Sequence, residues 1–351
     1  MDITIFLLSF VIILAGCEFF TNGVEWTGKR FGLSEGAVGS VLAAIGTALP
    51  ETLIPLIAIL ILGGSAGSEV GVGAILGAPF MLATLALFVC GLSVLAFAKR
   101  RNTGTLNING VLIRRDLTFF LVAYTLAAIA ALVPPPLGFI KTLVGFTLLP
   151  IYAVYLVYTL KTGETYSGKG PGDLYLDRAL TRLIHVKKKS GGFRHEPWTI
   201  LILVQLFASL AAIIIGASLF VGQINDIATR IGINPLILSL LISPLATELP
   251  EKFNSMLWIR ARKDTFAIGN ITGAMVFQSC IPVTIGILLT TWHLNLADKV
   301  QFLEAATIGI ALLSGLILYL RSSRREIKIS GLMLGGVFYL LFFIVVLMTI
   351  Y

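Results

Sequence analysis

Long apolar runs, separated by short polar and basic segments, recur along the whole 351-residue chain. A helix needs ~20 apolar residues to cross a hydrocarbon core ~30 Å thick, and ten runs approach or exceed that length. The pattern therefore predicts ten transmembrane helices, at 3–28, 34–62, 70–98, 116–133, 138–160, 197–226, 234–259, 265–291, 300–320 and 328–350. Several runs are longer than a crossing requires, so tilted or interrupted helices are expected.

The positions of Lys and Arg predict an orientation for these helices. With the N-terminus outside, all but four of the 26 basic residues fall in cytoplasmic loops, the exceptions being Lys141, Arg230 and Lys299 on the outer side and Lys252 within a span. Basic residues concentrate on the cytoplasmic side of membrane proteins. We therefore expect an integral protein of the plasma (inner) membrane with both termini outside.

The longest predicted loop, 161–196, is basic and separates two halves of five spans. Within it, the stretch 173–189 places its leucines near one helical face and its basic residues opposite. This pattern favours a helix lying on the inner membrane surface, and a regulatory ligand site is the alternative.

Composition narrows the class of protein. Apolar residues make up 57% of the chain and charged residues 13%, against about 25% charged in soluble domains. The net charge of +8 lies in short loops, where orientation explains it better than nucleic acid binding does. Cys17, Cys90 and Cys280 all lie in apolar runs, which argues against a disulfide framework, and no Cys/His spacing suggests a zinc site. The expected partners are the bilayer and inorganic cations, with no nucleic acid and no evident protein partner.

The two halves repeat each other. The stretch 46–51, GTALPE, recurs 200 residues later at 246–251 as ATELPE, and 73–78 aligns with 269–274. Five spans is an odd number, so the second copy enters the membrane from the opposite side, which makes an inverted repeat. We predict an all-α membrane protein of ten transmembrane helices arranged as two inverted five-helix repeats. The expected organisation is a first repeat 1–160 with its motif at 39–84, a cytoplasmic loop 161–196, and a second repeat 197–351 with its motif at 235–280.

Each repeated motif places one glutamate, Glu51 or Glu251, near the middle of a predicted span. A charged side chain at that depth costs ~2.5–3.5 kcal/mol on insertion scales and by default marks an ion pathway. Structural pairing with a basic residue explains one such glutamate, but poorly explains two at matching repeat positions. We therefore predict that both carboxylates bind transported ions.

Neighbouring residues add oxygen ligands. Thr47 and Thr247 precede the glutamates by four residues, on the same helical face. Pro50 and Pro250 disturb the preceding turn and free backbone carbonyls. Two carboxylates, two hydroxyls and loosened carbonyls suit a hard divalent cation such as Ca²⁺.

The paired motifs, each followed by a Gly-rich segment that opens the next span, resemble the α-repeats of sodium/calcium exchangers in the calcium/cation antiporter superfamily. The resemblance covers both repeats and the ten-span layout. It implies a central site with spans 1 and 6 sliding past it. The ligands it implies are Thr47, Glu51, Thr247 and Glu251, with backbone carbonyls near Ala44 and Pro244.

The chain departs from this family pattern in several side-chain oxygens. Asn270 keeps the Asn of the usual GN-x-x-GS stretch, whereas its counterpart is Ala74. Ala78 and Ala274 replace both serines. Leu82 and Gln278 occupy the later Asn/Asp positions, where Gln278 still offers a carbonyl oxygen. These losses favour weaker dependence on Na⁺, with protons as the substitute.

Glu248 and Lys252 are also unusual for the family. They lie four residues apart, so one helical turn can pair them. A self-neutralising pair is one reading, and Glu248 as an extra ligand or proton carrier beside a tethered Lys252 is the other. In span 1, Glu18 and Glu25 are weaker candidates for the lining of an aqueous passage.

The predicted function is secondary-active antiport of Ca²⁺ in exchange for Na⁺ or H⁺ by alternating access, without enzymatic activity or a cofactor. A proton-coupled exchanger for another divalent cation such as Mn²⁺ is an alternative. A cation channel and an intramembrane hydrolase are alternatives of other classes, and neither accounts for a duplicated, inverted acidic motif.

Overall fold

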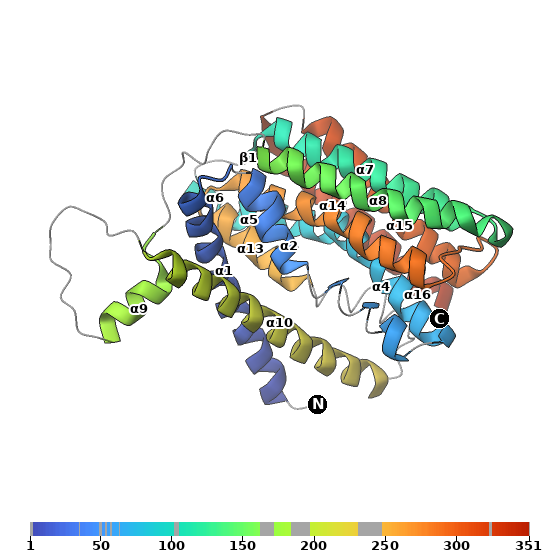
Figure 1. The fold of residues 1–351 in the computed structure, drawn as a ribbon, viewed down its shortest axis with the longest axis horizontal. Helices are drawn as coiled ribbons and strands as arrows, with labels where there is room; N and C mark the ends of the chain where they lie inside the picture. The colour runs from blue at the N-terminus through green and yellow to red at the C-terminus, as the bar shows by residue number, and fades with distance from the viewer. Residues whose placement is uncertain are drawn as a thin grey trace.

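The computed structural model consists almost entirely of helices (Figure 1). The structure describes residues 3–34, 36–48, 51–52, 55–56, 58–62, 64–101, 105–161, 172–183, 197–230, 248–322 and 325–350. Its elements are α1 (Ile3–Phe31), η1 (Ala37–Ala43), α2 (Ala44–Thr47), η2 (Ala58–Leu62), α4 (Gly64–Met81), η3 (Leu82–Ala86), α5 (Leu87–Ala96), α6 (Ala98–Arg101), β1 (Thr105–Asn107), α7 (Gly110–Leu132), η4 (Pro135–Leu137), α8 (Gly138–Lys161), α9 (Tyr175–Leu183), α10 (Thr199–Arg230), α13 (Leu249–Arg260), α14 (Asp264–Leu289), α15 (Lys299–Arg321), β2 (Glu326–Lys328) and α16 (Ile329–Ile350).

Eight helices in the described part of the chain are long and apolar enough to cross a membrane. They coincide with eight of the ten predicted spans. The other two predicted spans, 34–62 and 234–259, contain the paired glutamates and are described only in part. Their longest described helical pieces, Ala37–Thr47 and α13, are too short to span a bilayer alone. The count of ten spans therefore stays a prediction.

Helix α7 begins six residues before the predicted span. The Asn109 side chain caps it by accepting a hydrogen bond from the Leu112 backbone N–H at 3.3 Å. Arg114 and Arg115, assigned to a loop from their charge, instead lie in the first two turns of the helix. Arg114 donates to the Tyr319 hydroxyl at 3.0 Å, so this basic end of α7 packs against α15.

Two short strands were not predicted. β1 and β2 pair antiparallel, with Leu106 opposite Ile327. They join the segment before α7 to the segment before α16, outside the eight apolar helices. The described part of the predicted surface helix is present as α9, at 175–183, and the rest of that stretch lies outside the described residues.

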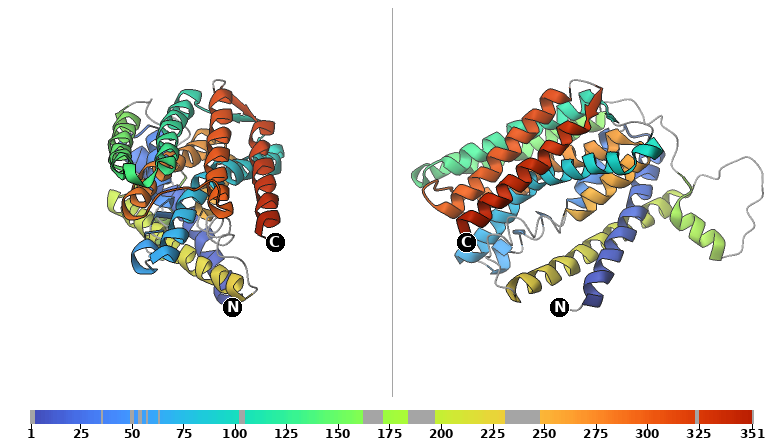
Figure 2. Two further views of the ribbon diagram at one scale, coloured as in Figure 1. Left: turned by 90° about the vertical axis from the view of Figure 1, so that its right-hand side faces the viewer. Right: turned by 180° about the vertical axis from the view of Figure 1, so that it is seen from behind.

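The repeated halves meet where α1 crosses α10 (Figure 2). A Cβ added to Gly16 would lie 2.9 Å from Cγ1 of Ile213, and a Cβ added to Gly216 would lie 3.0 Å from Cγ1 of Ile13. Gly16 and Gly216 are equivalent positions of the repeat, as are Ile13 and Ile213. Each half thus presents the same glycine to the same isoleucine of the other, the reciprocal contact typical of a two-fold relation.

Helix α14 occupies the centre of the molecule. In the most apolar 18-residue stretch of α14, 83% of the residues are buried inside the protein, against 22% in that of α16 at the periphery. A Cβ on Gly273 would lie 2.2 Å from the carbonyl oxygen of Ser40, so only a glycine lets α14 approach the backbone of η1 this closely. This contact joins the motif of the first half to that of the second.

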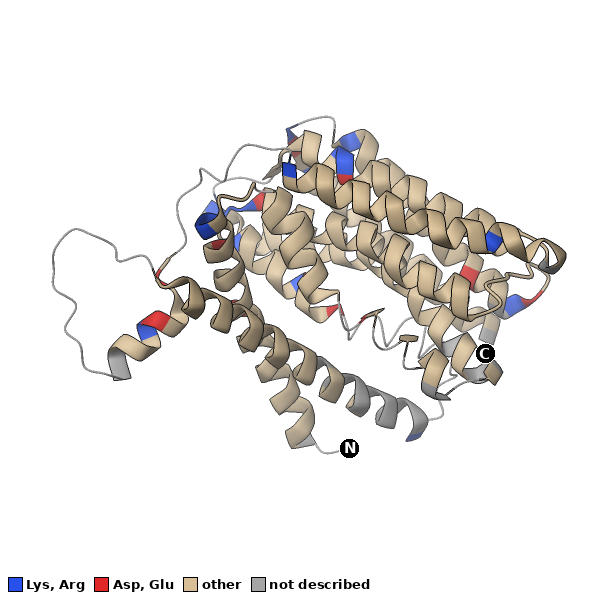
Figure 3. Cartoon of the chain, in the orientation of Figure 1, with Lys and Arg blue, Asp and Glu red and all other residues tan. Residues whose placement is uncertain are grey.

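Charged residues are sparse along the length of the helices (Figure 3). Lys and Arg gather mainly at the end of the molecule where β1 and the start of α7 lie. Both chain ends lie away from this basic end, the N-terminus at the bottom of the view and the C-terminus at the right (Figure 1). This distribution agrees with the charge asymmetry of the sequence, and the assignment of sides to cytoplasm and exterior stays a prediction.

Candidate cation site

Glu251 lies in the first turn of α13 and is fully buried. The helix begins at Leu249, so Pro250 occupies its first turn, where the missing proline N–H is not needed. We expected Glu251 near the middle of a span with a proline-disturbed turn before it. The described helix α13 starts at Leu249, which places the carboxylate at the positive end of its dipole, and the position within the whole span stays a prediction.

Glu51 follows the end of α2 at Thr47 and is also buried. It interacts electrostatically with Glu251, which brings together the two glutamates that the repeat singled out. None of the four carboxylate oxygens of Glu51 and Glu251 has a hydrogen-bond partner among the described residues. Because an unpartnered buried carboxylate is costly, these oxygens are typical of groups held ready for a ligand.

Thr47 lies beside this pair. Its buried hydroxyl lies close to the Glu251 carboxylate, but donates its one proton to the Ala43 carbonyl at 3.0 Å, so the carboxylate oxygens keep no donor in the described part of the chain. The Ala44 carbonyl accepts from the Ala48 N–H at 3.0 Å, so it remains within the helix, with a second lone pair available. Thr247 and Pro244, the corresponding candidates in the second half, lie outside the described residues.

Helix α14 brings two amide side chains into the buried core. Asn270 donates through Nδ2 to the Glu251 carbonyl and to Ser255 Oγ, both at 3.3 Å, while its Oδ1 has no partner. Both amide atoms of Gln278 are buried without a partner. Gln278 is two turns further along, or ~12 Å, so it lies at a different depth from Asn270.

Glu248 and Lys252 form the ion pair that their spacing predicts. Lys252 Nζ lies 2.9 Å from Glu248 Oε2, and both side chains are buried. Within the described part of the chain, no three His, Cys, Asp or Glu side chains are arranged to hold a metal ion. A cation at this site would therefore combine the Glu51 and Glu251 carboxylates with hydroxyl, amide and carbonyl oxygens.

Two features of this region were missed from the sequence. Asn254, one turn after Glu251, is fully buried, and neither of its amide atoms has a partner. A polar residue inside a predicted span, three positions after Glu251, was the available signal, but position 54 of the first half is Ile, so the repeat did not single it out.

Asp116 is the second missed feature. It accepts hydrogen bonds from Ser40 Oγ at 2.6 Å, Thr272 Oγ1 at 2.9 Å and Arg115 Nη2 at 2.8 Å. The fully buried carboxylate thereby ties together η1, α7 and α14. A lone acidic residue at the edge of an apolar run was the available signal, and its partners lie too far away in sequence to be inferred.

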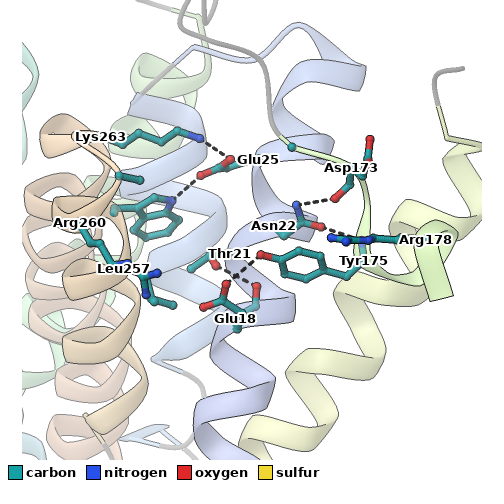
Figure 4. A pocket seen from close by; sticks show the side chains of 13 residues that line it. Glu18, Thr21, Asn22, Glu25, Asp173, Tyr175, Arg178, Leu257, Arg260 and Lys263 are labelled. Atoms are coloured by element: carbon teal, nitrogen blue, oxygen red, sulfur yellow. Dashed lines mark hydrogen bonds and ion pairs between the residues drawn. The ribbon is translucent and has the colours of Figure 1, made fainter. Parts of the chain in front are cut away.

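The weaker candidates Glu18 and Glu25 line a cavity of about 360 Å³ (Figure 4). Glu25 accepts from Trp258 Nε1 at 2.9 Å and pairs with Lys263. Tyr175 donates to Glu18 at 2.8 Å, and burial together with this bond raises the pKa of Tyr175 to about 12. The cavity agrees with an aqueous passage, but both glutamates also have structural partners.

The model of the sodium/calcium exchanger protein family matches residues 1–161 and 201–351, which include both repeated motifs. This chain belongs to that family. Its members are membrane transporters that exchange cations, not enzymes, and the chain is an integral membrane protein. The predicted family is thereby confirmed.

Relatives and solved structures agree with this assignment along nearly the full chain. An uncharacterized membrane protein of Methanocaldococcus jannaschii is 24% identical over 90% of this chain and 88% of its own. The sodium/calcium exchanger MaX1 of Methanosarcina acetivorans is 22% identical over 97% of both chains. A solved structure of the sodium-calcium exchanger NCX_Mj superposes with a TM-score of 0.69 at 20% identity, over 97% of this chain and 96% of that one. The fold is therefore that of an exchanger.

Proposed function

We propose that this protein is a Ca²⁺/cation antiporter in which Glu51 and Glu251 bind the transported ion. The observation that carries the proposal is the pair of buried carboxylates, one from each half, whose four oxygens have no partner among the described residues. Their mutual electrostatic interaction makes a divalent cation between them favourable. Thr47, Asn270 and the Ala44 carbonyl are the proposed additional ligands, with Thr247 and Pro244 in the second half and Gln278 deeper along α14.

The same two charges explain exchange rather than leak. Without an ion, the carboxylates leave a charge of −2 in a dry site, and transferring such a charge across hydrocarbon is prohibitive. One Ca²⁺ cancels this charge, as do monovalent cations in sufficient number. Only neutralised states then switch between the two faces, which couples the fluxes.

The reciprocal contacts of Gly16 and Gly216 support the proposed arrangement of ten spans in two inverted repeats. We also propose the plasma (inner) membrane as the location, with the basic ends of the helices on the cytoplasmic side and both termini outside. The crossing helices α1 and α10 are then the elements that slide past the site.

For the counter-ion we propose protons ahead of Na⁺. Ala78, Ala274 and Leu82 supply no side-chain oxygen, and Na⁺ needs several well-placed oxygens. A proton needs only a carboxylate, and a buried carboxylate beside another acidic group binds one readily. The positive charge of Lys252 opposes proton binding because it favours the ionised carboxylates.

Flux in proteoliposomes tests this choice. Vesicles with an outward proton gradient and no Na⁺ should accumulate ⁴⁵Ca²⁺, and dissipating the gradient with a protonophore should abolish the accumulation. A Na⁺ gradient at constant pH is the parallel arm. Accumulation that requires Na⁺ and ignores pH would reverse the choice of counter-ion, and absence of gradient-driven accumulation in both arms would contradict Ca²⁺ antiport.

A further inference from the structure

The charges around the site are unequally distributed between the two halves. Glu248 and Lys252 correspond to Ala48 and Thr52 at the repeat offset, so the second half carries an extra acid and an extra base. Both are buried, with Nζ and Oε2 2.9 Å apart. The pair adds a negative and a positive charge to the site, and its net contribution is zero.

The positive charge of Lys252 also acts on carboxylates other than that of Glu248. It interacts electrostatically with Glu51 and with Glu251, so its ammonium group belongs to the field of the transport site. The side chain is covalently attached to α13 and cannot leave with the substrate. It is therefore a permanent positive charge beside the carboxylates that bind the mobile ions.

Three other buried carboxylates of the described chain pair with basic residues away from the site. Asp264 pairs with Arg101, Asp116 with Arg115, and Glu25 with Lys263. With Glu248 compensated by Lys252, the charge that mobile ions must balance is the −2 of Glu51 and Glu251. Without Lys252, a third carboxylate would raise this charge to −3.

We propose that Lys252 is a fixed cation of the transport site that cancels the charge of Glu248, so that Glu51 and Glu251 alone set the exchange at two monovalent cations for each divalent cation. This inference rests on the proposed function. One Ca²⁺ moving one way carries two positive charges, and two monovalent ions moving the other way carry two. The cycle is therefore electroneutral. Ala78, Ala274 and Leu82 supply no side-chain oxygen, so a third monovalent ion would lack ligands.

The final ratio of internal to external ⁴⁵Ca²⁺ in proteoliposomes measures the net charge moved in each exchange cycle. A fixed counter-ion gradient drives uptake, while K⁺ gradients with valinomycin set the membrane potential. For the wild type we expect the final Ca²⁺ ratio to be independent of potential. A cycle moving one net charge would shift the ratio about fiftyfold for ~100 mV.

Three variants test whether Lys252 is the residue that compensates the charge of Glu248. Lys252→Met leaves Glu248 uncompensated and should reduce the Ca²⁺ flux at least tenfold. Glu248→Gln/Lys252→Met restores the charge balance and should recover most of that flux, again with a potential-independent ratio. Lys299→Met, which removes one exposed positive charge at the start of α15, is the matched control and should behave as the wild type.

The outcomes separate the two proposals. Ca²⁺ accumulation that follows the potential would overturn the electroneutral cycle and leave Ca²⁺ antiport standing. A double variant as impaired as Lys252→Met would overturn the role of Lys252 as the compensating charge. Absence of any counter-ion-dependent Ca²⁺ accumulation in the wild type would overturn the proposed function, and the inference with it.

Discussion

Replacing Glu251 or Glu51 by glutamine should abolish Ca²⁺ exchange while leaving a folded protein. Glutamine keeps the volume of the side chain but removes one of the two charges that balance a divalent ion. Losing one partner of a buried charge interaction costs ~3–5 kcal/mol, which corresponds to a loss in flux of at least ~100-fold. The measurement is the initial rate of ⁴⁵Ca²⁺ uptake into proteoliposomes at matched protein content.

Glu326→Gln provides the control for this prediction. Glu326 lies on β2 and is exposed, so the same chemical change occurs away from the site. Its uptake should equal that of the wild type. Size-exclusion profiles of all variants in detergent report folding, and a well-folded Glu251→Gln or Glu51→Gln variant with near-normal uptake would contradict the proposed site.

Replacing Asp264 is expected to have the largest effect on stability. Its buried ion pair with Arg101 lies where α13 is followed by α14. Arg101 binds both oxygens of Asp264, at 2.7 and 2.6 Å, and also donates to the Thr105 carbonyl at 3.2 Å. Asp264→Leu leaves the guanidinium buried without its carboxylate. The variant should lose ~3–5 kcal/mol of unfolding free energy, measured as a lower Tm in detergent.

Two further variants separate the pair from its surroundings. Arg101→Met/Asp264→Leu removes both charges and should recover part of the lost stability, because no single charge remains buried. Lys99→Met removes an exposed positive charge two residues before Arg101 and should leave the Tm unchanged. Equal Tm values for Asp264→Leu and the wild type would show that this pair does not stabilise the junction.

The apolar pattern predicted most of the fold because each crossing helix must carry its own long hydrophobic run. Eight spans followed directly from this requirement. The start of α7 was placed too late because Arg114 and Arg115 have the charge of a loop, whereas a helix can begin at Asn109 and place them at its polar end. Strands of three residues, such as β1, carry too little periodicity to be recognised.

The candidate site was predictable where the two halves share a residue type. Glu51 and Glu251 drew attention because a costly charge occurs twice at equivalent positions. Asn254 has an isoleucine as its counterpart, so the repeat concealed it. The partners of Asp116 come from helices distant in sequence, and only the packing of α14 against η1 and α7 brings them together.

Equilibrium exchange of Ca²⁺ for ⁴⁵Ca²⁺ tests the central claim most directly, because it needs neither a counter-ion gradient nor a membrane potential. Vesicles loaded with unlabelled Ca²⁺ are diluted into tracer ⁴⁵Ca²⁺ at the same total concentration. The proposed antiporter predicts saturable tracer entry that requires internal Ca²⁺ and disappears in Glu51→Gln/Glu251→Gln. Tracer entry that is indifferent to internal Ca²⁺, or that persists in the double variant, would contradict alternating access at these two carboxylates.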